Sequence, residues 1–97
     1  MDVTTQIDKN KHNGAFEINN NGKTVAQMTF RFSGATKIII LHTEVDSEYK
    51  GQGLGKLLLS NAIAFAQESA LKILPLCPFA KAYFDKHPEW NSIVFTN

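Results

Sequence analysis

The sequence has few of the features that mark membrane or secreted proteins. Its longest run of large aliphatic residues is the four residues from Ile38 to Leu41, far below the roughly 20 apolar residues that span a bilayer. The first ten residues lack the basic start and apolar centre of a signal peptide. Cys77 is the single cysteine and has no partner for an internal disulfide. These absences predict a cytoplasmic protein without a membrane partner.

An excess of charge of either sign is also lacking. The chain has 97 residues, with ten Lys and Arg against nine Asp and Glu, and no run of five like charges. Proteins that bind nucleic acid commonly show a basic patch or stripe, so this balance predicts no nucleic-acid partner. The length suits one hydrophobic core. We therefore expect residues 1–97 to form a single domain.

Alternating polar and apolar residues predict a β-hairpin near the N-terminus. The runs Ala15–Asn19 and Lys23–Phe32 alternate, and the turn between them contains Asn-Gly, which accepts the positive φ values of tight hairpin turns. The core-facing side of the second run is expected to carry Ala26, Met28, Phe30 and Phe32. The next run, Lys37–Val45, is rich in β-branched residues and apolar on both faces over its first half. This pattern predicts the middle strand of a sheet, covered from both sides.

Apolar residues at steps of three and four predict a helix of about four turns behind three alternating glycines. Its buried face is expected to carry Leu54, Leu57, Leu58, Ala62, Phe65 and Ala66. The run Leu71–Cys77 is predicted to be a second buried strand, parallel to Lys37–Val45 across that helix. Cys77 and Pro78 suit the cap and first position of another helix, which ends at His87. With an edge strand expected in residues 90–97, the order β-β-β-α-β-α-β predicts an α+β fold, in which a mixed sheet packs with two helices.

The segment "YKGQGLGK", Tyr49–Lys56, places glycine at alternate positions in a turn from a strand into a helix. Such a turn presents backbone N–H groups, reinforced by the helix dipole, to anionic oxygens. A dinucleotide-binding loop, G-x-G-x-x-G, does not fit because the third glycine comes one residue early. A nucleotide-triphosphate loop does not fit because Lys50 replaces its first glycine and Leu57 its hydroxyl residue. A structural turn that binds nothing remains as an alternative.

The stretch "VDSEYKGQGLGKLLL", Val45–Leu59, resembles the signature of the GNAT superfamily of acyl-CoA-dependent N-acetyltransferases, with Lys50 in place of the commoner Arg or Gln. Downstream, "CPFAKAYFDK", Cys77–Lys86, follows the spacing of the last GNAT helix. Together with "HTEV", these segments look like the group of very small, YjdJ-like GNAT proteins over residues 15–90. The resemblance implies a minimal GNAT fold, with two parallel strands splayed around the cofactor. It also implies that the leading strand and the helices that help build the acceptor site of full-length relatives are missing.

The resemblance further implies that the chain binds acetyl-CoA as a cosubstrate and needs no metal. The backbone amides of Gln52–Lys56 would hold the pyrophosphate, and Thr43–Val45 on the first splayed strand would pair with the pantetheine arm. The expected cofactor-binding residues are Thr43, Val45, Lys50, Gly51, Gln52, Gly53, Leu54, Gly55 and Lys56. The reactive end of the cofactor is then expected near His42, Glu44 and Cys77.

These three side chains are the candidates for catalysis of acetyl transfer. His42 can act as a general base near neutral pH, and Glu44 can bind a cationic acceptor. Strict alternation places both on one face with Ile38 and Ile40, unless a β-bulge intervenes. Cys77 stands at a helix start, where the thiolate is favoured, which suggests an acetyl-cysteine intermediate. Each has a structural alternative: a strand histidine, an exposed carboxylate and a small buried hydrophobe.

Two observations limit this catalytic prediction. A metal site is not predicted, because the strand is expected to end near Val45, before the last of the alternating donors His42, Glu44, Asp46 and Glu48. Many GNAT enzymes carry a tyrosine that protonates the coenzyme A thiolate, but Phe84 stands at that place, with Tyr83 about 100° round the helix. The sequence therefore predicts an N-acetyltransferase acting on an amine, such as a protein lysine or N-terminus. The alternatives are a coenzyme A-binding protein with little or no activity, and a nucleotide-binding module.

Overall fold

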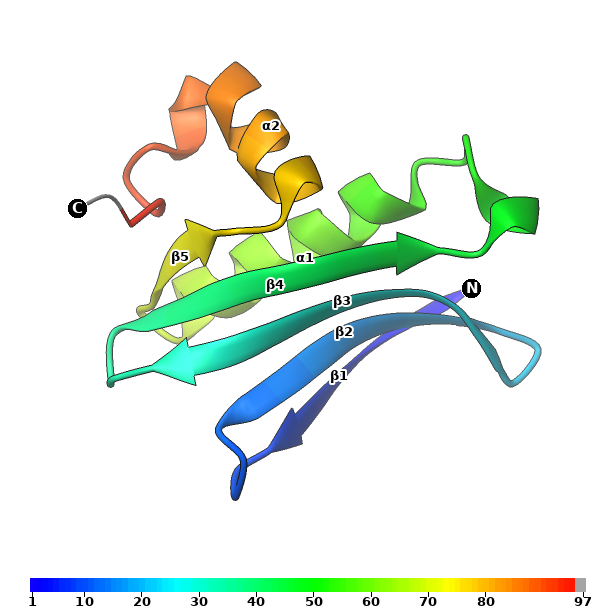
Figure 1. The fold of residues 1–97 in the computed structure, drawn as a ribbon, viewed down its shortest axis with the longest axis horizontal. Helices are drawn as coiled ribbons and strands as arrows, with labels where there is room; N and C mark the ends of the chain where they lie inside the picture. Colours follow the sequence, from blue (N-terminus) through cyan, green and yellow to red (C-terminus); the bar gives the residue numbers. More distant parts are fainter. Residues whose placement is uncertain (96–97) are drawn as a thin grey trace.

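The computed structural model describes residues 1–95, and within them five strands form one mixed sheet (Figure 1). In chain order the strands are β1 (Asp2–Asp8), β2 (Asn13–Asn20), β3 (Lys23–Ser33), β4 (Lys37–Val45) and β5 (Lys72–Pro75). Their order in space is the same, with antiparallel pairs from β1 to β4 and a parallel pair between β4 and β5. The predicted mixed sheet is confirmed. Its middle strand is β3, so the expectation that Lys37–Val45 lies in the middle was wrong by one strand.

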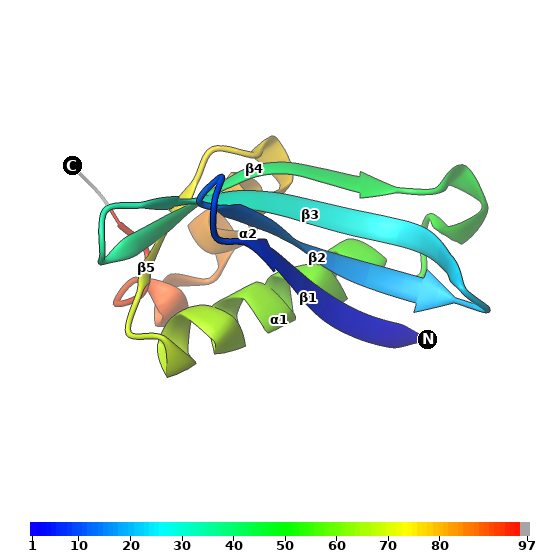
Figure 2. The same ribbon diagram turned by 90° about the horizontal axis from the view of Figure 1, so that it is seen from below.

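Two helices pack with this sheet: α1 (Leu54–Glu68) connects β4 to β5, and α2 (Pro78–Lys86) follows β5. Short 3-10 helices, η1 (Ser47–Tyr49) and η2 (Pro88–Trp90), precede the glycine turn and follow α2. As predicted, Cys77 is the N-cap of α2 and Pro78 begins the helix. Figure 2 shows α1 running along one face of the sheet, while no helix of the described chain lies over the other face of β1 to β4.

The hydrophobic core lies between α1 and the sheet face that it covers. Phe16 of β2 and Phe30 of β3 stack with ring centroids 4.8 Å apart, and Phe65 of α1 meets Phe16 at 5.6 Å. The other buried core side chains on these elements include Ile18, Met28, Ile38, Ile40, Leu54, Leu58, Leu59, Ala62, Ile63 and Ala66. Leu57 was expected in this set but is 40% exposed. Leu57 and Leu59 lie about 100° to either side of Leu58, and the helix turns the Leu59 flank toward the sheet.

Strand β1 corrects the expectation that the leading strand is missing. It pairs with β2 from Asp2 opposite Asn19 to Asp8 opposite Asn13. The sequence does not reveal it because, as an edge strand, it buries little apolar surface; Ile7 is 44% exposed. A tight turn joins β1 directly to β2, and the Asp8 carboxylate accepts hydrogen bonds from two backbone amides of that turn. No helix intervenes between the two strands.

Strands β4 and β5 separate after a short parallel ladder. They pair only over Lys37–Ile40 and Lys72–Pro75. Beyond that ladder the backbone amides of Leu76 and Cys77 both donate to the Ile40 carbonyl at 3.1 Å, and the chain turns into α2. Among the described residues, β4 from Leu41 to Val45 therefore has no strand beside it on this edge, as Figure 1 shows. The predicted splay of two parallel strands is confirmed.

The C-terminal segment forms less β-structure than expected. Within the described residues, the strand predicted over 90–97 is reduced to a single parallel bridge between Ile73 and Val94. Thr96 and Asn97 lie outside the described residues. Between residues 1 and 95, no helix has both the length and the apolar character needed to cross a membrane.

Candidate functional site

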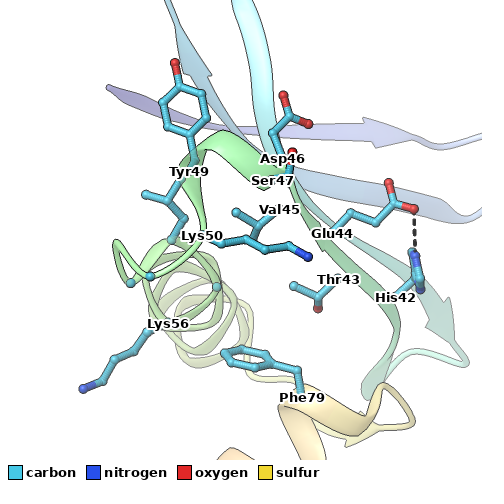
Figure 3. Close-up of a pocket in the computed structure, with 14 residues that line it drawn as sticks. His42, Thr43, Glu44, Val45, Asp46, Ser47, Tyr49, Lys50, Lys56 and Phe79 are labelled. Atoms are coloured by element: carbon cyan, nitrogen blue, oxygen red, sulfur yellow. Dashed lines mark hydrogen bonds and ion pairs between the residues drawn. The ribbon is translucent and has the colours of Figure 1, made fainter.

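A groove of about 910 Å³ lies where β4 and β5 separate (Figure 3). One wall is the end of β4, from His42 to Val45. The other walls are residues 50–51 and 53–56, in the glycine turn and at the start of α1, and the ring of Phe79 at the start of α2. The groove thus joins an unpaired strand edge to a helix N-terminus, two places where backbone N–H groups lack partners.

The glycine turn is open toward this groove. Gly51 and Gly53 have φ values of +82° and +77°, which residues with a Cβ rarely adopt, and a Cβ built on either would meet no atom within 4 Å. Gly53 caps α1 without a side-chain hydrogen bond, and its carbonyl accepts the amide of Leu57 at 3.0 Å. The amides of the first turn of α1 therefore remain available for an anion.

The third glycine of the turn serves a different purpose from the other two. Gly55 lies inside α1 with ordinary helical backbone, and a Cβ there would come within 3.0 Å of Phe79 Cζ. Gly55 lets the Phe79 ring pack directly against the helix backbone. Phe79 was not among the residues predicted for the site, and only its position in the "CPF" segment after the splayed strand points to it.

A β-bulge at Leu41 reverses the side-chain alternation of β4. In the ladder with β3, Ile40 pairs with Phe30 and His42 pairs with Thr29, so Leu41 is the extra residue. Directly paired residues of two strands share a face of the sheet. Ile40 therefore faces the core with Phe30, whereas His42 lies on the opposite face with Thr29.

The expectation that His42 and Glu44 share a face with Ile38 and Ile40 was therefore wrong, because strict alternation does not cross a bulge. His42 Nε2 and Glu44 Oε1 are 2.9 Å apart, and their side chains are 64% and 69% exposed. Figure 3 shows the pair at the end of the groove away from the glycine turn. The structure thus brings these two predicted residues together at the groove surface.

Thr43 projects from the other face of β4 and contacts Cys77. In the ladder it pairs with Met28 of the core, and its Oγ1 is 3.2 Å from Cys77 Sγ. Cys77 is only 3% exposed and is not among the residues that line the groove. The structure therefore places the Cys77 thiol and the His42–Glu44 pair on different faces of β4.

Two basic residues of the predicted site behave differently. Figure 3 shows the side chain of Lys50 extending across the groove toward Thr43, whereas Lys56 points away from the groove. Lys50 is therefore the cation placed to meet the negative charge of a ligand in the groove.

The β2–β3 hairpin turn holds the segment before the glycines in place. Asn20 Nδ2 donates to Tyr49 Oη at 2.8 Å, and Lys23 Nζ lies 3.5 Å from Asp46 Oδ2. The Asp46 amide also donates to the Val25 carbonyl at 2.8 Å. These contacts fix the path of the chain between β4 and the glycine turn. The sequence gives no sign of them, because each joins residues that are far apart in the chain.

No tyrosine hydroxyl of the last helix reaches the groove. Phe84 is buried in the core, and the Tyr83 ring stacks on His87 with centroids 4.0 Å apart. The groove does contain Tyr49, whose hydroxyl is engaged by Asn20. Within residues 1–95, no three His, Cys, Asp or Glu side chains gather closely enough to hold a metal ion.

Comparisons with known proteins agree with this geometry. A family model described as GCN5-related N-acetyl-transferase matches residues 15–93. The chain is 27% identical to Protein NATD1 of Gallus gallus over 84 residues, which covers 86% of this chain and 76% of that protein. It is also similar to the solution structure of a GCN5-like protein from Staphylococcus aureus, with 32% identity, a TM-score of 0.71 and coverage of 97% and 89% of the two chains.

A more distant structure shows likeness in fold alone. It is a GNAT family acetyltransferase from Elizabethkingia anophelis with acetyl-CoA bound, at 15% identity and a TM-score of 0.63, with coverage of 77% of this chain and 52% of that one. The family match covers most of the chain, and the splayed strands and glycine turn lie within it. The chain therefore belongs to the GCN5-related N-acetyltransferase family.

Proposed function

We propose that this protein transfers the acetyl group of acetyl-CoA to an amine, as a cytoplasmic enzyme of the very small, YjdJ-like group, and that residues 1–97 form one acetyltransferase domain. The observation that carries the proposal is the groove where the unpaired edge of β4 meets the glycine turn at the start of α1. The fold is shared with an E. anophelis acetyltransferase that has acetyl-CoA bound, which supports the same ligand here.

The residues of the groove fit this cosubstrate. Gly51 and Gly53 leave open space that a Cβ would enter, beside the free amides of the α1 start, and this suits a pyrophosphate. The unpaired edge of β4 at Thr43–Val45 offers backbone groups to the amides of a pantetheine arm. Lys50 adds a positive charge. The remaining residues proposed to hold the cosubstrate are Gln52, Leu54, Gly55 and Lys56, through their backbone amides, and Phe79, through its ring.

Acetyl-CoA would supply an activated thioester carbonyl, and His42 and Glu44 would act on the amine. We assign to His42 the role of a general base that removes a proton from the acceptor ammonium. Glu44, whose Oε1 lies 2.9 Å from His42 Nε2, orients the imidazole. Both side chains are exposed at the groove, which suits contact with an acceptor from solvent.

Cys77 provides the alternative route. In it, the Cys77 sulfur forms a bond to the acetyl carbon, the thiolate of coenzyme A leaves, and the acceptor amine then takes the acetyl group and frees the cysteine. Cys77 Sγ lies 3.2 Å from Thr43 Oγ1, and a side chain only 3% exposed is poorly placed to attack. We therefore propose direct transfer to the amine.

A coenzyme A-binding protein with little catalysis is a second candidate function. The observation that favours it is the absence, within the described residues of the groove, of a tyrosine hydroxyl directed at the place of the leaving thiolate. The Tyr49 hydroxyl points away from the groove (Figure 3), where it accepts a hydrogen bond from Asn20, and the Tyr83 ring stacks on His87. Water would then have to supply that proton, and transfer would be slow.

Calorimetry and turnover test these proposals together. Titrations with acetyl-CoA, coenzyme A and ATP should show binding of both CoA compounds and none of ATP; failure of both to bind would contradict the cosubstrate assignment. Replacing His42 with Asn should then lower the rate of amine acetylation about 100-fold or more. His12→Asn is the matched control, since His12 is an exposed histidine remote from the groove.

Intact-mass analysis after incubation with acetyl-CoA separates the two routes. Direct transfer predicts that the protein stays unmodified and that the Cys77→Ser variant remains active. One added acetyl group that is lost in Cys77→Ser, together with lost turnover, would instead support the cysteine route. Binding of acetyl-CoA without any amine acetylation would support the second candidate function.

A further inference from the structure

We propose that the acceptor is an amine on a positively charged, extended polypeptide that docks on the sheet face opposite α1. This inference rests on the proposed function and names its acceptor class. Figure 2 shows that no helix of the described chain lies over this face of β1 to β4. We refer to it as the open face.

The open face continues into the groove through the bulge at Leu41. Because the bulge reverses the alternation of β4, His42 and Glu44 stand on the open face and also line the groove. A chain lying on the open face can therefore present a side chain or its terminus to the groove without passing through the core. Without the bulge, these two side chains would point toward α1.

A shallow hollow lies on the open face next to His42. It has a volume of about 500 Å³, and its lining includes Ala15, Thr29 and Leu41. Leu41 is 41% exposed, which is unusual for a leucine inside a sheet, because the bulge leaves it without a direct partner on β3. The hollow offers an apolar contact for one side chain of the polypeptide, beside the His42–Glu44 pair.

The charge on this face is negative near the groove. The strand register places three cross-strand rows on this part of the face: Asp2, Asn19 and Thr24; Thr4, Glu17, Gln27 and Glu44; Gln6, Ala15, Thr29 and His42. They contain three carboxylates and neither Lys nor Arg, although the whole chain has a net charge of +1. Arg31 lies in the next row, farther from the groove. A basic polypeptide complements this distribution, whereas an acidic one is repelled.

Each exposed charge contributes modestly and is screened by salt, which makes the effect measurable. The probes are two peptides with one central lysine, flanked by arginines in one and by aspartates in the other, and free lysine amide as a small acceptor. At low salt the arginine-flanked peptide should show the highest kcat/KM, and its advantage should shrink as salt is raised. Equal kcat/KM for the two peptides at low salt would overturn the proposal, and so would equal values for the basic peptide and lysine amide.

A pair of variants locates the effect on the open face. In the unaltered protein, Gln27 Nε2 donates to Glu17 Oε2 at 2.9 Å. Glu17→Gln removes the carboxylate charge and keeps a polar partner for the Gln27 side chain. It should lower kcat/KM for the basic peptide up to about fivefold, with lysine amide and coenzyme A binding unchanged. The control Glu68→Gln removes the same charge from the C-terminal end of α1 and should have no effect. An equal loss in both variants would refute docking on this face.

A measurement without turnover keeps the docking surface separate from the catalytic proposal. In the protein loaded with coenzyme A, the arginine-flanked peptide should shift backbone amide NMR signals of β1 to β4, and not those in the second half of α1. If no amine is acetylated but these shifts appear, the proposed activity fails and the docking surface stands. If amines are acetylated but the peptide shifts no signals of the open face, the docking surface is wrong.

Discussion

Replacing Gly53 with Ala should both destabilise the protein and weaken its binding of coenzyme A. Gly53 holds φ at +77° where it caps α1, and a residue with a Cβ in this left-handed region costs roughly 1–2 kcal/mol. The loss is partly offset because alanine has less freedom than glycine in the unfolded chain, an effect of roughly 0.4–1 kcal/mol. No atom lies within 4 Å of the new Cβ, so no clash adds to the cost.

The expected net loss in the free energy of unfolding is about 1 kcal/mol, which for a domain of this size lowers Tm by roughly 4–8 °C. Calorimetric or circular dichroism melting measures it. The ligand effect has a separate cause: the methyl group enters the space proposed for the pyrophosphate. Losing one charge-assisted hydrogen bond to phosphate, worth about 1.5–3 kcal/mol, should raise Kd for coenzyme A about tenfold or more.

Gly22→Ala is the matched control. Gly22 has φ of +80°, also with no atom within 4 Å of a built Cβ, but it lies in the β2–β3 turn and does not line the groove. It should lower Tm by a similar amount and leave Kd for coenzyme A unchanged. An unchanged Tm in both variants would refute the backbone argument. A normal Kd for Gly53→Ala would refute the assignment of the glycine turn to the pyrophosphate.

Three further predictions concern packing and the path of the chain around the groove. In the unaltered chain, Gly55→Ala places a Cβ 3.0 Å from Phe79 Cζ and should lower the free energy of unfolding. In a Phe79→Ala background the same change should instead raise the free energy of unfolding by up to about 1 kcal/mol, through helix propensity. Urea titration of the variants would measure both effects. Tyr49→Phe removes the hydrogen bond from the hairpin turn and should cost about 0.5–1.5 kcal/mol, with faster hydrogen exchange at residues 50–56; unchanged exchange there would contradict a holding role for this bond. Leu58→Ala, at a fully buried position, should cost about 2–5 kcal/mol, whereas Leu57→Ala, at an exposed one, should cost less than about 0.5 kcal/mol; equal losses would show that the buried face of α1 is wrongly assigned.

The fold was predictable wherever the sequence repeats a short pattern. Alternation gave the β2–β3 hairpin, with Asn21 and Gly22 at φ of +53° and +80° in its turn, and the spacing of apolar residues gave α1. The Cys77–Pro78 boundary gave the start of α2. β1 was not predicted, because an edge strand that buries little apolar surface carries only a weak apolar pattern.

The candidate site was predictable where it consists of backbone and less so where it consists of side chains. The glycine turn is visible as a string of residues, and the structure opens it toward the groove. The orientation of His42 and the burial of Cys77 depend on one inserted residue, Leu41, and on the pairing of β4 with β3. A bulge of this kind changes no residue type, so a single sequence holds no signal for its position.

The five strands lie side by side in the sheet in the same order as they follow in the chain, and this order has a consequence for how the protein folds. Every neighbouring pair from β1 to β4 is joined by a short turn, so these contacts close small loops and can form early. The pairing of Lys37–Ile40 with Lys72–Pro75 must wait for the whole of α1 to be placed. Because the groove exists only once that late step is complete, a ligand in it would slow unfolding by holding together the two parts of the chain that assemble last.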